Sequence, residues 1–436
     1  MSGKSPFVFN VVALLLASPL VAEEIPLTYV KYDKEDPLPY QPLGYSRIES
    51  TRTPPPGDWK LPPLANEKPL FLLVPLGDSE RLFVLDATKT GPGFDRLFAD
   101  RDGDGDLTED EVVRAAAEGQ LDFPRLDLTL TVAGRPVPYS LRIDVLYRSV
   151  TFVNGVPVHQ TDDATARLYV QCCYAGTIQR GDRAYRVILN DYNANGRFDD
   201  RGALADFEVL AANTSARLIG DRLYIDTGET LDSRDVNFLG ECLWLDGVLY
   251  RVRIDTAASK LTLTPVTDGL APLEIACVPE RLDLCAEDGS CSVMLLRPPA
   301  QVRLPTGRYR LARYQVYRSD SESDSWFLSA TASRETPVIT VGGSAVARLE
   351  IGEPFAPRAM VVESSAQAVG RGDDKGASLR FFVTGRANEI VTDLAHLSGS
   401  STLIELDRQR RRPKEPTYTV MSPTGEIVTQ GTFAYG

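Results

Sequence analysis

Histidine is nearly missing from this chain, and the common nucleotide-binding and nucleophile motifs are missing altogether. Only two histidines, His159 and His396, occur in 436 residues, and the six cysteines include no C-x-x-C pair. A structural zinc site, which needs about four Cys or His ligands, is therefore not expected. No P-loop, G-x-G-x-x-G or G-x-S-x-G occurs either, so no motif points to a nucleotide site or a Ser-His-Asp hydrolase.

Basic residues are outnumbered and scattered. The net charge is −13, and the one basic run, Arg408 to Arg412 with Lys414, lies in a polar stretch near the end. Because phosphate recognition needs clustered Lys and Arg, we do not expect a nucleic-acid partner. The acidic balance instead fits a soluble protein that attracts cations.

Long apolar runs are limited to the first residues of the chain. Lys4 is followed by FVFNVVALLLASPLVA and then by Glu23-Glu24, which is typical of a signal peptide over residues 1–22. The run is shorter than the roughly 20 residues that span a bilayer, so no membrane span is expected. The pattern predicts a secreted or periplasmic protein. Leu20 is not a small residue, which leaves the cleavage point open.

An even number of cysteines in a secreted chain suggests disulfide bonds without fixing their pairing. Cys277, Cys285 and Cys291 lie close together in the sequence, and Cys242 is a further partner for one of them. Cys172 and Cys173 are adjacent in a strand-like run, so their side chains should point to opposite faces. A vicinal bridge, two separate bridges and free buried thiols all remain open for that pair.

The richest motif is DRDGDGDLTEDE at residues 100–111, where oxygen-bearing side chains alternate. Gly105 at position 6 permits the sharp turn that lets alternate side chains face one cation. Leu107 at position 8 would anchor the loop, and Asp106 at position 7 would use its backbone carbonyl. The ligand set expected for Ca²⁺ is Asp100, Asp102, Asp104, Asp106, Thr108 and Glu111.

This loop resembles that of the EF-hand family, and the likeness extends over about residues 94–119. Phe94, Leu97 and Phe98 have helical spacing before the loop, while Thr108 and Glu111 form a capping box before VVRAAAEG. The resemblance implies a helix, a calcium loop and a second helix. It also suggests a likeness to uncharacterised secreted bacterial proteins that contain EF-hands.

A second loop, DYNANGRFDD at residues 191–200, repeats the first half of this pattern after a strand-like AYRVIL. It looks like the calcium loops of dockerin-like and thrombospondin-type modules, but position 12 is Gly202, so Asp199, or Asp200, would replace the missing carboxylate. A solvated Asn-Gly turn is the alternative. The ligand set expected here is Asp191, Asn193, Asn195, Arg197 through its carbonyl, and Asp199.

Short alternating runs separated by Gly, Asn, Asp and Pro predict a mainly β, multi-domain, β-sandwich-like architecture with an inserted helix-loop-helix. Pro-rich residues 23–69 read as an arm or linker, and residues 70–268 as a β domain with the two loops. Residues 269–356 form a small sandwich in this interpretation, since LPTGRYRL resembles a turn of PEGA-like and carboxypeptidase-regulatory-like modules. Residues 357–436 would be an immunoglobulin-like sandwich.

The sequence therefore favours a secreted calcium-binding protein in which Ca²⁺ stabilises a β-rich binding or structural scaffold for a protein or carbohydrate partner. The alternative is a secreted hydrolase. LYIDTGET contains the Asp-Thr-Gly turn of aspartic proteases at Asp226, but Glu229 departs from that family's pattern and no second such turn follows an apolar strand. Carboxylates of a carbohydrate-active enzyme would be scattered and leave no motif.

Overall fold

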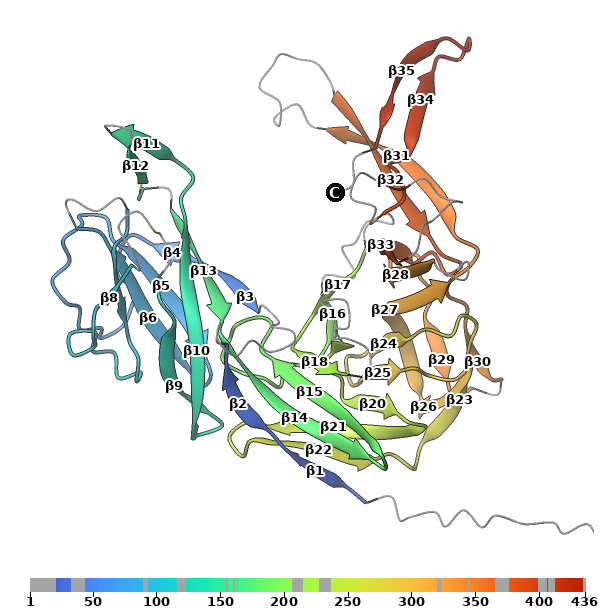
Figure 1. Ribbon diagram of the computed structural model, residues 1–436, viewed down its shortest axis with the longest axis horizontal. Helices are drawn as coiled ribbons and strands as arrows, with labels where there is room; N and C mark the ends of the chain where they lie inside the picture. The colour runs from blue at the N-terminus through green and yellow to red at the C-terminus, as the bar shows by residue number, and fades with distance from the viewer. Residues whose placement is uncertain are drawn as a thin grey trace, which may run out of the picture.

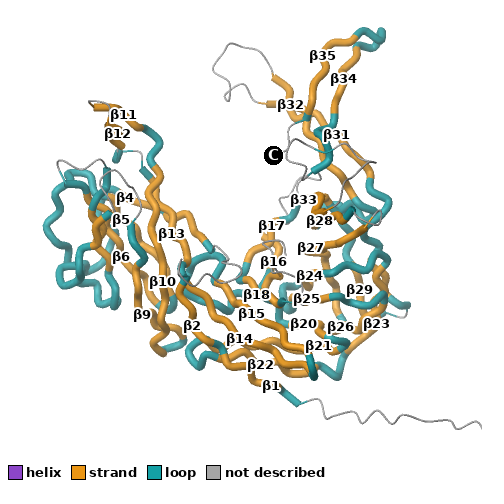
Figure 2. Tube along the Cα trace, in the orientation of Figure 1, coloured by secondary structure: helices purple, strands orange, loops and turns teal. Residues whose placement is uncertain are grey.

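The computed structural model is built from strands, and no helix occurs among the residues that it describes (Figure 2). The mainly β prediction is confirmed. The described residues are 21–32, 44–88, 93–115, 123–153, 156–159, 161–162, 164–205, 215–226, 237–319, 324–343, 345–364, 376–398, 406 and 412–433. Residues 1–20 of the predicted signal peptide lie outside them, as do residues 227–236 after Asp226.

Two sheets form the end of the molecule that carries the first loop (Figure 1). A five-stranded sheet comprises β4 (Ser50–Thr51), β5 (Leu70–Leu76), β6 (Ser79–Asp86), β7 (Arg96–Ala99) and β8 (Val113–Arg114) in that order. A four-stranded sheet has the order β3 (Tyr45–Ile48), β13 (Thr165–Val170), β10 (Arg135–Leu146) and β9 (Leu126–Val132). The hairpin of β11 (Val150–Val153) and β12 (Val156–His159) extends from this end.

A second five-stranded sheet lies in the middle and carries the second loop. Its order is β19 (Asn237–Phe238), β18 (Arg222–Ile225), β15 (Arg183–Asn190), β14 (Cys172–Arg180) and β2 (Thr28–Lys31). Beside it, β16 (Ala203–Ala205) pairs with β17 (Arg217–Ile219).

The longest sheet has 12 strands and runs from the middle to the other end of the molecule. Its order is β1 (Glu23–Pro26), β22 (Lys260–Pro265), β21 (Val248–Asp255), β20 (Cys242–Leu245), β25 (Ser292–Leu296), β24 (Arg281–Ala286), β27 (Gly307–Ser319), β28 (Ser325–Thr331), β33 (Ile390–Ser398), β32 (Gly376–Thr384) and β31 (Ala356–Ser364), with β29 (Ile339–Val341) on β27. A three-stranded sheet has the order β26 (Gln301–Pro305), β23 (Leu270–Ile275) and β30 (Ala347–Leu349), and β34 (Thr417–Met421) pairs with β35 (Ile427–Thr432).

Two large cores follow from this arrangement. The first joins side chains of both five-stranded sheets, the four-stranded sheet and the strands β1, β20, β21, β22 and β25. The second joins β24, β25, β27 and β28 to the three-stranded sheet. Because the long sheet contributes to both cores and continues through β31–β33, it crosses the boundaries predicted at residues 268 and 356.

The predicted arm and the predicted C-terminal sandwich differ from the structure. In the segment predicted as an arm, β1 to β4 pair with four different sheets, and Ile25 and Ile48 are buried. These short strands need no core of their own, because each pairs with a strand from a later part of the chain. In the segment predicted as a C-terminal sandwich, β31 to β33 extend the long sheet instead, and the other strands described there form only the two-stranded sheet β34–β35.

The helix predicted before the first loop is strand β7. Leu97 packs into the first core, whereas Phe98 packs on the opposite face with Phe71, Val84 and Leu107. Residues 59–64 cover that outer face, so β5, β6 and β7 are buried on both sides. A doubly buried strand is apolar at successive positions, and in so short a segment this cannot be told from helical spacing. After the loop, Val113–Arg114 is a strand, and residues 116–122 lie outside the described part.

Candidate metal site

The loop of residues 100–111 closes a β-hairpin. Leu97 of β7 pairs with Val113 of β8, so both ends of the loop are held at neighbouring strands. Asp100 continues from β7, and its amide donates to the Leu82 carbonyl of β6 (3.0 Å). The chain therefore enters the loop from a rigid, doubly buried strand, which fixes the position of the Asp100 carboxylate.

The middle of the loop is tied to a segment that precedes the sheet. The Lys60 amide donates to the Gly105 carbonyl (2.9 Å), and the Leu107 amide donates to the Lys60 carbonyl (3.0 Å). Leu107 is 1% exposed, which confirms its predicted role as the apolar anchor. Gly105 has φ +82° and faces the Trp59 ring, so the turn at position 6 occurs where the sequence placed it.

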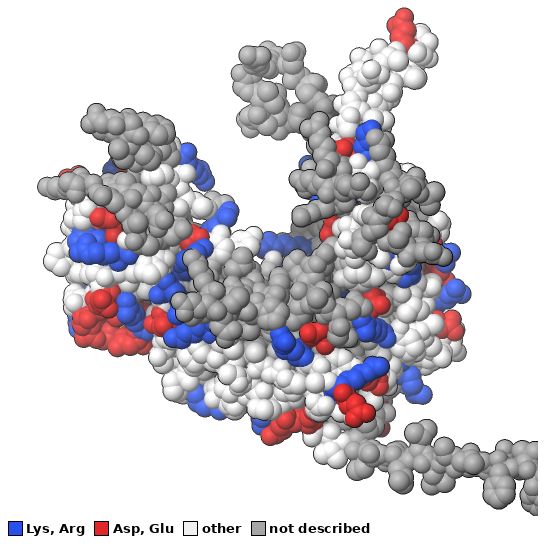
Figure 3. All heavy atoms as spheres, viewed as in Figure 1, with Lys and Arg blue, Asp and Glu red and all other residues white. Residues whose placement is uncertain are grey.

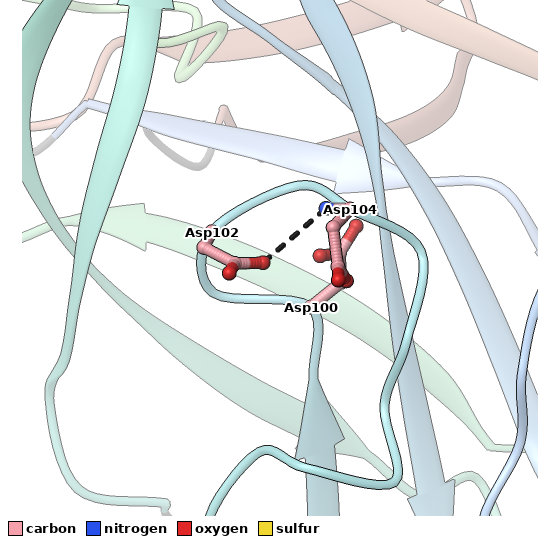
Figure 4. A group of neighbouring side chains, drawn as sticks. All are labelled: Asp100, Asp102 and Asp104. Carbon is pink, nitrogen blue, oxygen red and sulfur yellow. Dashed lines mark hydrogen bonds between the residues drawn. The ribbon is translucent and has the colours of Figure 1, made fainter.

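Three carboxylates converge inside this loop (Figure 4). Asp100, Asp102 and Asp104 each offer an oxygen atom, and these three atoms lie within 4.8 Å of one another. Successive backbone amides orient them: Gly103 donates to Asp100 (2.8 Å), Asp104 to Asp102 (3.2 Å) and Asp106 to Asp104 (2.7 Å). Within the described residues this is the one such group of His, Cys, Asp or Glu side chains.

Asp100 is the unusual member of the three. Its side chain is 1% exposed, yet its Oδ2 atom has no hydrogen-bond partner. The buried Arg81 guanidinium lies near its other oxygen, with 3.7 Å between Arg81 Nη1 and Asp100 Oδ1. Burial raises the pKa of Asp100, while the Arg81 charge opposes this rise. A buried carboxylate oxygen without a donor is costly, and a cation in the loop would satisfy it.

The other predicted ligands do not all face the cluster. The Asp106 carboxylate pairs with Lys60 Nζ (2.7 Å) and accepts from the Thr108 amide, and these bonds lower its pKa to about 2. Its side chain is thereby occupied, which suits a residue expected to use its carbonyl. Glu111 is exposed, and its carboxylate does not belong to the converging group.

Asp110 lies near the cluster, although it, like Glu111, is not one of the three converging carboxylates. Its Oδ2 accepts from the Arg101 amide (3.3 Å). Burial raises the pKa of Asp110, and the negative charges of Asp102 and Asp100 add to this rise.

Acidic side chains gather on the surface around the loop. Figure 3 shows red side chains concentrated beside β8, at the end of the molecule that carries the first loop. Asp102, Asp104 and Glu109 are exposed there, and the negative charges of Asp104 and Asp106 raise the pKa of Glu109. Their mutual repulsion is the electrostatic cost that a divalent cation would remove.

The second loop has another arrangement. It follows strand β15, as predicted, and Asp191 is fully buried. Asp191 Oδ1 accepts from the Ala194 and Asn195 amides, and Oδ2 accepts from the Gly196 amide (2.7 Å) and the Tyr139 hydroxyl (2.8 Å). Both oxygens are therefore used by the protein. Asp191 therefore stabilises the turn, and neither of its carboxylate oxygens is left unpaired to bind a cation.

The remaining residues of the second loop also differ from the expected set. Asn193 and Asn195 donate their side-chain amides to Asp200 (2.9 and 2.6 Å), whereas Asp199 is exposed. Arg197 pairs with Asp78 (2.6 Å). Asp221, which directly precedes β18, accepts from the Tyr192 and Asp200 amides, and no motif in the sequence indicated it. The structure thus brings Asp200, the alternative to Asp199, to the asparagines.

Neither histidine stands beside a nucleophile in a recognisable triad among the described contacts. His159 ends β12 and lies against the Tyr147 ring, with 4.8 Å between the centroids. His396 is a buried member of β33, with its Nε2 atom 3.4 Å from Asp324 Oδ1. Asp226 directly follows β18, and Thr227 to Glu229 lie outside the described residues.

Comparisons with known proteins add no family: no protein-family model, curated protein or solved structure matches the chain. Among the described residues, no helix is long and apolar enough to cross a membrane.

Proposed function

We propose that this is a calcium-binding protein in which Ca²⁺, held by loop 100–111, stabilises a β-rich binding or structural scaffold. The observation that carries the proposal is the buried Asp100 Oδ2 atom, which lacks a donor and lies beside the carboxylates of Asp102 and Asp104. All ligands offered are hard oxygen atoms, the donors that Ca²⁺ prefers over zinc or copper.

The same geometry explains what the ion would do. The loop joins β7 to β8 and is hydrogen-bonded to Lys60, so an ion bound by Asp100, Asp102 and Asp104 would fasten three segments of the chain. It would also cancel the repulsion among the carboxylates. Its effect would be local stiffening of a formed sheet, because β7 is already buried on both faces. This stabilising role differs from that of calcium sensors, in which the ion opens a pair of helices.

Calorimetric titration of the chelator-treated full chain with CaCl₂ tests this proposal. We expect one binding event in the wild type and a loss of at least about tenfold in affinity in Asp104→Asn, which removes one ligand charge. Glu109→Gln is the matched control, because it removes one charge from the same loop outside the converging group. Absence of a binding event in the wild type, or equal weakening by both substitutions, would overturn the proposal.

A further inference from the structure

Two of the six cysteines lie next to each other in space although 49 positions separate them in the sequence. Cys242 Sγ and Cys291 Sγ are 3.9 Å apart, and all six cysteines are thiols in the structure. Cys242 begins β20, and Cys291 precedes β25, which runs parallel to β20. Since Cys242 pairs with Val293, Cys291 lies two positions before the partner and on the same face of the sheet.

The backbones around both cysteines are fastened together. Glu241, the neighbour of Cys242, accepts hydrogen bonds from both the amide (2.5 Å) and the hydroxyl (2.7 Å) of Ser292, the neighbour of Cys291. On the other side of Cys291, the Ala286 amide donates to the Cys291 carbonyl (2.7 Å) across the β24–β25 turn. The two sulfur atoms are therefore held facing each other by contacts that do not involve the sulfurs.

The two thiols differ in access and acidity. Cys291 is half-buried, whereas Cys242 is 3% exposed. The Cys291 thiol donates toward Cys242 Sγ, and this bond, helped by the charges of Arg251 and Arg201, lowers the pKa of Cys242. Cys291 can thus meet a reagent from solution, and Cys242 stands behind it as the more acidic thiol.

The other four cysteines have separate surroundings. Cys172 packs into the first core and Cys173 into a small cluster on the opposite face of β14, as the sequence predicted. Cys285 lies 3.7 Å from the Gly202 carbonyl, and burial raises its pKa to about 12. Cys277 accepts from Arg318 (3.4 Å). None of these contacts joins one cysteine sulfur to another.

We propose that Cys242 and Cys291 form a disulfide that cross-links the parallel strands β20 and β25 when the protein meets a small-molecule disulfide in an oxidising compartment. The sulfur atoms must approach by about 2 Å to reach bonding distance. The cross-link does not depend on the calcium site, which lies on a different sheet.

The exchange is balanced in two steps. The pKa of Cys291 is raised by its bond to Cys242 and by burial, so Cys291 first loses its proton to a base in solution; it then attacks one sulfur of the reagent RSSR, forms a mixed disulfide and expels RS⁻. The Cys242 thiolate then attacks Cys291 Sγ, forms the new bond and expels the second RS⁻. The two protons released by the cysteines convert both RS⁻ ions to RSH, so the cysteine pair is oxidised and the reagent is reduced.

The experiment treats the full chain with oxidised glutathione, counts thiols after denaturation, and maps non-reduced peptides. We expect the count to fall from six to four, a peptide joining residues 242 and 291, and a higher melting temperature that a reductant reverses. The count of Cys277→Ser, the control, should fall from five to three. Cys242→Ser and Cys291→Ser should form no internal bridge. Six remaining thiols, a glutathione adduct alone, or a different bridge would each overturn the proposal.

Discussion

The loops at 100–111 and 191–200 begin with the same pattern, an acid or amide at positions 1, 3 and 5 and glycine at 6, yet the protein uses them differently. In the first loop Asp100 keeps one buried oxygen without a donor. In the second, four donors saturate Asp191. The two loops show that this spacing of acids, amides and glycine predicts a turn. Whether the turn can bind a cation depends on whether the carboxylate at position 1 has an oxygen that no protein donor occupies.

The strongest way to test the structural role of the second loop is Asp191→Ala. This substitution leaves three backbone amides and the Tyr139 hydroxyl without their buried acceptor, so we expect a loss of about 3 to 5 kcal/mol in the free energy of unfolding, with or without calcium. Urea unfolding in chelator and in CaCl₂ measures it. An unchanged free energy in chelator would show that Asp191 does not hold the loop.

The second loop should also impose a pH dependence. Burial raises the pKa of Asp191 from 3.8 to about 7, and burial with the nearby Asp191 and Asp200 charges raises that of Asp221. The native state then holds protons that the unfolded state releases between about pH 4 and pH 7, so the free energy of unfolding should fall by a few kcal/mol as the pH rises through this window. Urea unfolding at several pH values would show it. An equally steep decline in Asp191→Asn would refute the assignment.

The first loop should instead respond to the ion. Calcium at a hundredfold excess over its Kd should raise the free energy of unfolding by about 2.7 kcal/mol. Asp100→Asn should lose most of this gain, and a second-loop control, Asp199→Asn, should keep it because that side chain is exposed. Thermal unfolding with chelator and with CaCl₂ decides the matter. If calcium still raised the free energy of unfolding of Asp100→Asn by the same amount, the calcium site would have to lie elsewhere in the protein.

A smaller effect distinguishes the carboxylate that closes the first site. Asp110 lies close enough to Asp100 and Asp102 for their charges to raise its pKa, whereas Glu111 is exposed, and neither residue belongs to the converging group. We therefore expect Asp110→Asn to weaken calcium binding about tenfold, or about 1.4 kcal/mol, and Glu111→Gln to weaken it less than about twofold. Calorimetric titration compares the two variants. A larger loss of affinity in Glu111→Gln than in Asp110→Asn would instead show that Glu111 closes the site, as in the EF-hand loop.

The smallest expected effect concerns Asp199, one of the ligands predicted for the second loop. Since its side chain is exposed and Asp200 takes the contacts with Asn193 and Asn195, Asp199→Ala should change the free energy of unfolding by less than about 0.5 kcal/mol. Urea unfolding provides the measurement. A loss near that of Asp191→Ala would mean that Asp199 supports the turn.

The local chemistry of both loops could be predicted from residues close in sequence. Gly105 and Gly196 adopt the positive φ angles that such turns need, Leu107 and Phe198 are buried at position 8, and a strand precedes Asp191. The secondary structure that flanks the first loop could not be predicted. Strand β7 pairs with β6 and β8, and the side chains that pack over Phe98 come from residues 59–64. None of these contacts leaves a local pattern.

The sequence by itself determined the alternation that makes strands, the acidic charge and the two turns, because each depends on neighbouring residues and on backbone conformation. Only the tertiary structure decided that Asp100 is buried beside Arg81, that Asp191 meets Tyr139, and that Cys242 faces Cys291. These outcomes depend on segments between 19 and 52 positions apart. The free energy of a carboxylate or thiol is set by the groups that surround it in space.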